Sequence, residues 1–269
     1  AGKCVPLCRM NSINAKEDRH FVTALARGLE VLSAFRSRDR MLCNQQLAQR
    51  CGLPKSTISR LTYTLTKQGF LQHTVDSRGQ PGYKLGSAVL ALGSAMLARM
   101  DMRQLARPHM QDLADLSQAM VSLGMRDRLS MIYVENCRSE AALTLSLDVG
   151  SRIPVATTAM GRAYLSVCDE RERRDLYERI ERNDPAAWPV LHDSIEAARA
   201  EFEATGCCSS FGEWRSDVNA IAVAFRVPVR GNVMAINCGG PAYNLSPEHL
   251  LNNVRPKMLA LSDRLRGAK

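Results

Sequence analysis

The sequence predicts an α+β fold in which an N-terminal winged helix-turn-helix is joined by a linker helix to a C-terminal α+β domain. Three observations support this prediction. Residues 23–85 show three helical patterns followed by a hairpin pattern, strand and helix patterns mix from residue 101 onward, and the whole net charge of +9 lies before residue 87. The chain then consists of a flexible arm (1–20), a helix-turn-helix domain (21–86), a linker helix (87–100) and a C-terminal domain (101–269).

The first two helices follow from apolar spacing. Residues 23–36 predict a helix because four apolar side chains form one stripe: Leu25, Leu29, Leu32 and Phe35. Residues 44–51 predict a short second helix with Asn44 as its N-cap. Its inward side chains are expected to be Leu47, Ala48 and Cys51.

A tight turn at residues 52–54 leads into the third helix, predicted from Pro54 to Gln68. Gly52 suits the left-handed end of the second helix, and Pro54 suits the first position of the third. The third helix has a buried face of Ile58, Leu61 and Leu65. Gly69 ends it, and strands at residues 70–75 and 83–85 then form a hairpin around a turn rich in glycine and polar residues.

The outward face of this third helix has the composition that a major-groove reader requires. Hydroxyl groups suit phosphate oxygens, and an arginine can bond guanine in bidentate fashion, a role we expect of Arg60. Arg78 at the hairpin tip is expected to reach the DNA backbone or the minor groove. The predicted DNA contacts are Arg27, Lys55, Ser56, Thr57, Ser59, Arg60, Tyr63 and Arg78.

The charge distribution agrees with a polyanionic partner. Through Gly86 the chain has 14 Lys and Arg against 5 Asp and Glu, whereas from Ser87 onward it has 22 of each. A charge excess confined to one segment indicates a module that faces a polyanion, attached to a neutral body. A solvated basic surface without a partner is the alternative reading of the charge alone.

Residues 87–100 predict a helix that is apolar on several sides, which indicates a linker and dimer element covered by a second copy. Beyond it, helices are expected at residues 102–117, 160–167, 170–180, 194–205 and 248–265. Strands are expected at residues 121–125, 129–135, 142–147, 221–228 and 232–238. Elements of this length around one sheet are typical of a domain that senses small molecules.

Composition excludes several other classes. The nine cysteines form no C-x-x-C pair, the apolar runs are too short for a membrane span, and the first twenty residues lack a signal-peptide core. We therefore expect a cytoplasmic protein without membrane contact, cofactor or metal. Zinc bound by Cys207, Cys208 and Cys238 is an alternative with poor spacing.

The residues at these positions resemble the IclR family of bacterial regulators. The resemblance is carried by residues 47–61, by 68–71, by 83–86 and, in the second half, by Gly150-Ser151-Arg152-Ile153-Pro154 and Met160-Gly161-Arg162-Ala163-Tyr164-Leu165. Gly206, Ser210, Glu213 and the run 220–222 fall at the spacing of the family's C-terminal signature, and residues 237–241 match the strand end that follows. It covers roughly residues 23–265.

The resemblance implies a GAF-like effector domain, homodimers that pair into tetramers, palindromic operators and control of a catabolic operon. It places the effector pocket at Ala142, Ile153, Ala159, Met160, Ser210, Ala220, Asn237 and Gly239. Some members have an acidic residue where this chain has Ser210 and a Cys where it has Ala220. They also have a Ser where it has Asn237. These departures favour an aromatic acid or another larger carboxylate over a very small 2-oxo acid. Ile153 and Met160 are equally explained as ordinary core.

The sequence thus favours a ligand-responsive, DNA-binding transcriptional regulator. Two alternatives stay open. A winged-helix adaptor for proteins would need a charge-neutral recognition face. A cysteine-dependent enzyme would use Cys207, Cys208 or Cys238 with His192, but no catalytic motif accompanies these residues.

Overall fold

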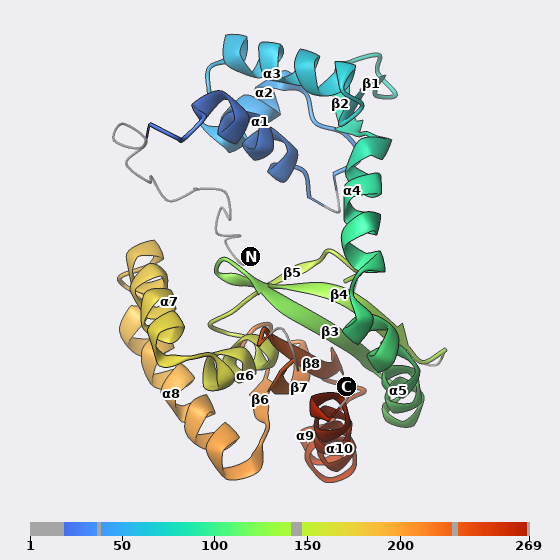
Figure 1. Cartoon of the computed structure of the whole chain (residues 1–269), viewed down its shortest axis with the longest axis vertical. Coiled ribbons are helices and arrows are strands. Elements are labelled where there is room, and N and C mark those ends of the chain that lie inside the picture. The colour runs from blue at the N-terminus through green and yellow to red at the C-terminus, as the bar shows by residue number, and fades with distance from the viewer. Residues whose placement is uncertain (1–18, 37–38, 141–146, 228–230, 268–269) are drawn as a thin grey trace. The chain divides into compact units, whose positions relative to one another are not determined.

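The fold is seen in a computed structural model that describes residues 19–36, 39–140, 147–227 and 231–267. The chain divides between Arg99 and Met100 into two compact units (Figure 1). The expected arm at residues 1–20 lies almost wholly outside the described residues. Among the helices of the described residues, none is long and apolar enough to cross a bilayer.

The N-terminal unit is a winged helix-turn-helix, as predicted. Its elements are α1 (Thr23–Ser33), α2 (Asn44–Cys51), α3 (Lys55–Lys67), the antiparallel pair β1 (Leu71–Val75) and β2 (Pro81–Leu85), and α4 (Ser87–Ala98). A single antiparallel β-bridge joins Leu42 to Tyr83 of β2. Leu42, Leu47 and Ile58 are fully enclosed in the small core that the three helices share with β1.

The apolar stripe predicted for the first helix is wrong in its N-terminal half. Leu25 and Leu29 are 62% and 54% exposed, and Gly28 and Val31 are buried instead. Leu32 and Phe35 do pack against the core. Gly28 contributes no apolar side chain to the buried face, so the spacing of apolar residues alone does not mark this face.

The turn before α3 is formed as expected, whereas the helix caps differ by one residue. Gly52 has the left-handed φ of 66° that ends α2. The N-cap of α2 is Cys43 rather than Asn44, and the N–H of Cys43 donates to Gln46 Oε1 at 2.9 Å. Pro54 is the N-cap of α3 rather than its first residue.

The C-terminal unit is built on one antiparallel sheet of order β5-β4-β3-β8-β7-β6. Its strands are β3 (Met120–Asp127), β4 (Ser130–Arg138), β5 (Arg152–Pro154), β6 (Cys208–Phe211), β7 (Val218–Arg226) and β8 (Val233–Pro241). Its helices are α5 (Asp101–Ser117), α6 (Ala159–Val167), α7 (Glu170–Asn183), α8 (Trp188–Thr205), the short α9 (Pro247–His249) and α10 (Arg255–Arg266).

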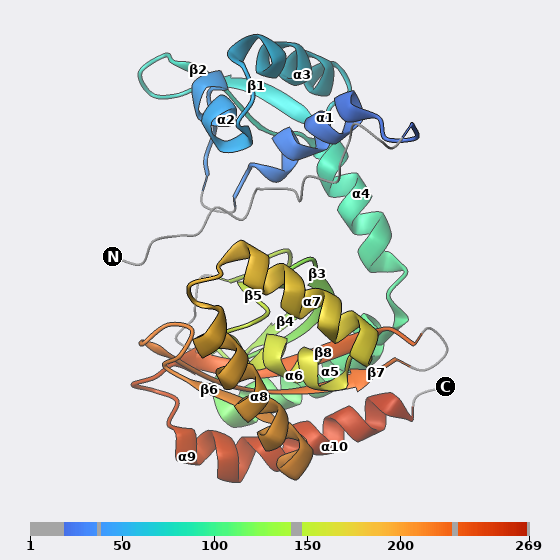
Figure 2. The same cartoon turned by 90° about the vertical axis from the view of Figure 1, so that its left-hand side faces the viewer.

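The helices cover the sheet on both sides. Figure 2 shows α6 with α7 and α8 on one face and α5 and α10 on the other. The face under α6 carries small residues along β7 and β8, and the larger Met131 and Tyr133 on β4. This arrangement confirms the α+β effector-domain fold and places α6 over the centre of the sheet.

Three elements differ from the prediction. The edge strands β5 and β6 were not expected; they have three and four residues, too few for a clear alternation of apolar and polar side chains. The single final helix is interrupted by a π-helical turn at Leu250–Val254. The strand expected at residues 142–147 falls almost entirely outside the described residues.

Candidate DNA-binding surface and effector pocket

The outer side of α3 has the exposure that the sequence predicts. Ile58 and Thr62 are buried, and Thr57 is half-buried. The other expected contacts on this helix are exposed: Lys55, Ser56, Ser59, Arg60 and Tyr63. The helix contains no acidic residue. The outward face is therefore a solvent-exposed set of basic, hydroxyl and phenol groups on a rigid element.

Packing on the inner side fixes the orientation of α3. Thr62 donates its hydroxyl to the Ile58 carbonyl at 2.9 Å, and Ile58 is fully buried against α1 and α2. Arg50 on α2 binds the Asp39 carboxylate and donates to the Ala34 carbonyl at 2.8 Å. Its guanidinium holds the pKa of Asp39 below the usual range. Arg50 therefore binds residues between α1 and α2, and this basic side chain of the helix-turn-helix has a structural role.

The wing tip presents a second basic group. Asp76 Oδ1 accepts backbone N–H groups of Arg78 at 2.8 Å and of Gln80 at 2.9 Å, so one carboxylate shapes the turn. The side chain of Arg78 is exposed at this turn. Arg27, the last expected DNA contact, is exposed on α1.

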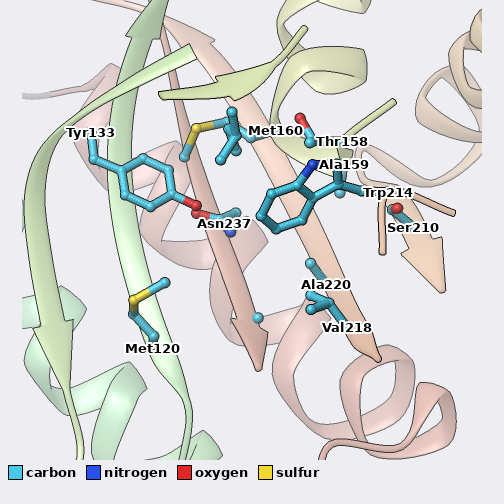
Figure 3. Close-up of a pocket in the computed structure, with 12 residues that line it drawn as sticks. Met120, Tyr133, Thr158, Ala159, Met160, Ser210, Trp214, Val218, Ala220 and Asn237 are labelled. Carbon is cyan, nitrogen blue, oxygen red and sulfur yellow. The ribbon is translucent and has the colours of Figure 1, made fainter. Parts of the chain in front are cut away.

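The expected effector residues come together in one pocket between α6 and the sheet. Seven of them line it, namely Ile153, Ala159, Met160, Ser210, Ala220, Asn237 and Gly239 (Figure 3). Ala142 lies outside the described residues. Ile153 and Met160 also belong to the hydrophobic core of the unit, so the core reading and the pocket reading describe the same wall.

Small residues make room for this pocket at its floor. A Cβ on Gly239 would lie 2.9 Å from the Ala220 Cβ, and a Cβ on Gly124 would lie 2.5 Å from Met160 Sδ. Larger side chains at either glycine would displace the walls. The cavity that remains between these side chains is about 20 Å³, which is room for a single water molecule, so a larger ligand must displace some of them.

A polar cluster lies at one end of the pocket. Ser122 on β3 pairs with Asn237 on β8 in register, and the Tyr133 hydroxyl points toward Asn237 (Figure 3). Asn237 Oδ1 and Ser122 Oγ are buried and make no hydrogen bond of good geometry within the described part of the chain, although both side chains lie near enough to the Tyr133 hydroxyl to interact with it. Burial raises the pKa of Tyr133 to about 12, so its phenol stays neutral at physiological pH. Such unsatisfied groups are equipped to bind a polar group of a ligand or water.

Uncharged groups line the opposite end. Thr158 caps α6: its Oγ1 accepts the Gly161 N–H at 3.2 Å and donates to the Pro154 carbonyl at 2.7 Å. Ser210 Oγ donates to the Thr157 carbonyl at 3.4 Å. None of the twelve lining residues carries a positive charge. An anionic ligand here would rely on hydroxyl groups and on N–H groups at the start of α6, which carries a partial positive charge.

Five lining residues were not predicted: Met120, Tyr133, Thr158, Trp214 and Val218. Tyr133 lies on a predicted strand, and strand alternation with Met131 was the signal that could have identified it. Trp214 follows Glu213 of the C-terminal signature and is one of two tryptophans in the chain. Its place in a loop gives no periodicity from which an inward orientation could be read.

The cysteines of the enzyme hypothesis are poor nucleophiles. Burial raises the pKa of Cys207 and Cys238 to about 12 and also raises the pKa of Cys208. A thiol needs a low pKa to react as thiolate. His192 packs its ring against Tyr177 and Trp188 on the α7–α8 pair. Within the ranges that the structure describes, no three His, Cys, Asp or Glu side chains are grouped to hold a metal.

Comparison with known proteins identifies the family of both units. The IclR helix-turn-helix domain model matches residues 24–74, and the model of the bacterial transcriptional regulator IclR C-terminal part matches residues 94–265. The chain is 35% identical over 240 residues to the HTH-type transcriptional regulator TsaQ1/TsaQ2 of Comamonas testosteroni, covering 88% of this chain and 84% of the relative. It is 29% identical over 249 residues to the Pca regulon regulatory protein of Pseudomonas putida, covering 91% and 83%.

Solved structures give the same result. An IclR family transcriptional regulator from Brucella abortus superposes with a TM-score of 0.81 at 40% identity, covering 97% of this chain and 96% of that one. An IclR homolog from Microbacterium hydrocarbonoxydans complexed with 4-hydroxybenzoate shares the fold, with a TM-score of 0.69, 21% identity and coverage of 91% and 100%. The chain therefore belongs to the IclR family of bacterial transcriptional regulators.

Proposed function

We propose that this regulator binds a palindromic operator through α3 and controls a catabolic operon in response to an aromatic acid or another small carboxylate. The observation that carries the DNA-binding half is the outward face of α3, which is exposed, free of acidic residues and rigidly held. Arg60 would read a base, while the hydroxyl groups and Lys55 would bind phosphates. The site of action would be the cytoplasm, where the DNA is.

A homodimer would supply the symmetry that a palindrome requires. No residue of α4 is buried by its own chain, and Leu90, Leu92 and Met96 are exposed. We assign the 87–100 segment to contact with a second copy, the 21–86 segment to DNA and the 101–269 segment to the effector. Pairing of dimers into tetramers is the further expectation from the family.

The effector would occupy the pocket under α6. Its apolar walls would enclose a ring, the N-terminus of α6 with Thr158 and Ser210 would bind a carboxylate, and Asn237 with Tyr133 would bind a second polar group. The two relatives support this class by name, since one regulates a Pca regulon and the other is complexed with 4-hydroxybenzoate. Binding would shift the relative placement of two DNA-binding domains through α4 and thereby change operator affinity.

Fluorescence anisotropy with the full chain tests the DNA-binding proposal. The duplex is the intergenic DNA upstream of its own gene, and the control is a scrambled duplex of equal length and composition. We expect the specific duplex to bind about 10³-fold more tightly, with affinity that falls steeply as salt rises. Equal affinity for the two duplexes would reject the proposal in favour of a protein-binding adaptor.

A thermal-shift screen tests the effector class. Aromatic acids, sugar acids and aliphatic acids are compared at equal concentration, and a ligand present at 100 times its Kd should stabilise the folded chain by about 2.7 kcal/mol. A shift produced only by aliphatic 2-oxo acids would contradict the aromatic assignment while leaving the DNA-binding proposal intact.

A further inference from the structure

The loop of residues 212–217 joins β6 to β7 and delivers a tryptophan to the effector pocket. Trp214 lines the pocket together with Ala159, Val218 and Ala220, and its indole lies among these residues in Figure 3. Gly212 begins the loop with a φ of 75°, and the Gly212 N–H donates to the Val218 carbonyl at 3.0 Å. The loop therefore closes on itself while Trp214 faces inward.

Glu213, next to this tryptophan, is held by a buried cation. Arg162 on α6 is 4% exposed and binds the Glu213 carboxylate at 2.6 Å. Arg162 also donates to Ser194 Oγ at 2.6 Å and to the Ala156 carbonyl at 3.2 Å. A guanidinium bound to three elements has little freedom, so the Glu213 contact fixes the loop against α6 and α8.

The indole of Trp214 is also supported from its own loop. The Arg215 guanidinium lies 5.8 Å from the centre of the indole, within the range of a cation–π contact. Asp217 binds Arg215 at 3.0 and 2.7 Å and so keeps the guanidinium in place. The indole of Trp214 therefore contacts Arg215 and also lines the pocket.

We infer that Trp214 is a specificity-determining residue that selects planar aromatic acids by stacking on their ring, and that the Arg162–Glu213 ion pair keeps it in position. The inference rests on the proposed effector pocket. Stacked aromatic rings gain affinity beyond the area that they bury, whereas a saturated ring of similar size gains only the area. The uncharged polar groups at both ends of the pocket fix the ends of the ligand but do not distinguish planar from puckered rings.

Two matched acids separate ring planarity from all other properties. Isothermal titration of the full chain compares 4-hydroxybenzoate with trans-4-hydroxycyclohexanecarboxylate, which has the same polar groups on a puckered ring. The wild-type chain should bind the aromatic acid more tightly by between about twofold and tenfold. Trp214→Phe should keep this preference, and Trp214→Leu should remove it while still binding both acids.

Tryptophan fluorescence and dissociation rates supply a second test, because a purely structural role of Trp214 or Glu213 would leave both unchanged. In a Trp188→Phe background, Trp214 is the only tryptophan of the chain, and its fluorescence should change on addition of 4-hydroxybenzoate. Glu213→Gln should raise the dissociation rate of 4-hydroxybenzoate severalfold, and Glu203→Gln on α8, the matched control, should not.

The outcomes are distinct. If wild-type and Trp214→Leu chains show the same preference, or if the Trp214 signal is unchanged at saturating acid, Trp214 does not select the ring and only this inference fails. If the wild-type chain binds neither acid, the proposed effector class fails and the inference fails with it. Should Trp214→Leu not fold, the Trp214→Phe ratio and the fluorescence titration decide.

Discussion

At the scale of single residues, Asn237 is the polar group on which the effector pocket depends most. Its side-chain oxygen is buried and has no hydrogen-bond partner of good geometry in the described part of the chain, and Ser122 is the residue paired with Asn237 on β3. An unpartnered buried acceptor costs folding free energy, about 1–3 kcal/mol. A ligand that donates a hydrogen bond to this oxygen recovers that free energy on binding.

Replacing Asn237 with Ala should therefore weaken effector binding about tenfold, since one hydrogen bond to the ligand is lost. Operator affinity without effector should stay unchanged, because residue 237 lies in the C-terminal unit. Titration calorimetry measures the first quantity and anisotropy the second. Loss of both activities would indicate misfolding and would contradict a role confined to the ligand.

Arg60 is the corresponding residue for DNA. Arg60→Ala should weaken operator binding by about 1–3 kcal/mol and relax the preference at one base pair of each half-site, if the guanidinium bonds a guanine. Lys55→Ala should instead weaken all duplexes alike and lower the salt dependence. Affinities for operators mutated at single positions distinguish the two, and unchanged affinity for Arg60→Ala would place base reading elsewhere on α3.

The sequence predicted seven of the twelve residues that line the pocket, but it did not predict Trp214 or the ion pair beside it. Motif resemblance located Ile153, Ser210 and Gly239 because short signatures fix their spacing. Trp214 and the partnership of Arg162 with Glu213 depend on the path of a loop and on a contact between residues 51 positions apart. No local pattern encodes such a contact.

At the scale of elements, a β-bulge between β3 and β4 links the pocket to α5. Leu123 pairs with Glu135 and Gly124 with Tyr133, so Val134 is an extra residue in β4. The bulge allows Tyr133 to face the pocket while Glu135 binds Arg103 at 2.8 Å and Arg107 at 2.6 Å on α5. In a regular strand both side chains would point to the same face.

Glu135→Gln should destabilise the chain by about 2–3 kcal/mol, because the carboxylate is buried and holds two cations, although both arginines remain partly hydrated. Urea unfolding followed by circular dichroism measures this change. As the control, Glu170→Gln removes an exposed i,i+4 pair on α7 and should change stability by less than about 0.5 kcal/mol. Equal effects of the two variants would show that Glu135 contributes no more than a surface charge.

The loop before α2 should show a pH-dependent contribution. Arg50 lowers the pKa of Asp39, so this ion pair stabilises the fold above the pKa of the unfolded chain and is lost as pH falls through the lower folded value. Asp39→Asn should lower stability by about 1 kcal/mol at pH 7 and by progressively less toward pH 3. A difference in unfolding free energy that is independent of pH would contradict this role.

Periodicity predicted the long elements well and the packing of α1 poorly. Hydrophobic spacing gave α2, α3 and the main strands to within a few residues. It assigned Leu25 and Leu29 to the core because it counts apolar side chains, whereas the buried face of α1 includes Gly28, which has none.

At the scale of the whole molecule, the exposed apolar surface of α4 is the proposed contact between two copies of the chain. Leu92→Glu would place a charge in the proposed contact between copies and should raise the dimer Kd at least tenfold, since each buried leucine contributes about 1.5–3 kcal/mol. Val190→Glu introduces the same charge at an exposed position of α8 and should leave the dimer Kd unchanged. Sedimentation equilibrium reports both, and an unchanged mass for Leu92→Glu would locate the dimer contact elsewhere.

The proposed function depends most on α3 lying in the major groove of an operator. Guanine N7 methylation interference tests it directly, because N7 is exposed only in that groove. We expect methylation to abolish binding at guanines of two half-sites whose centres are about 10 base pairs, or a multiple of that, apart. Binding that tolerates N7 methylation throughout the duplex would contradict the claim.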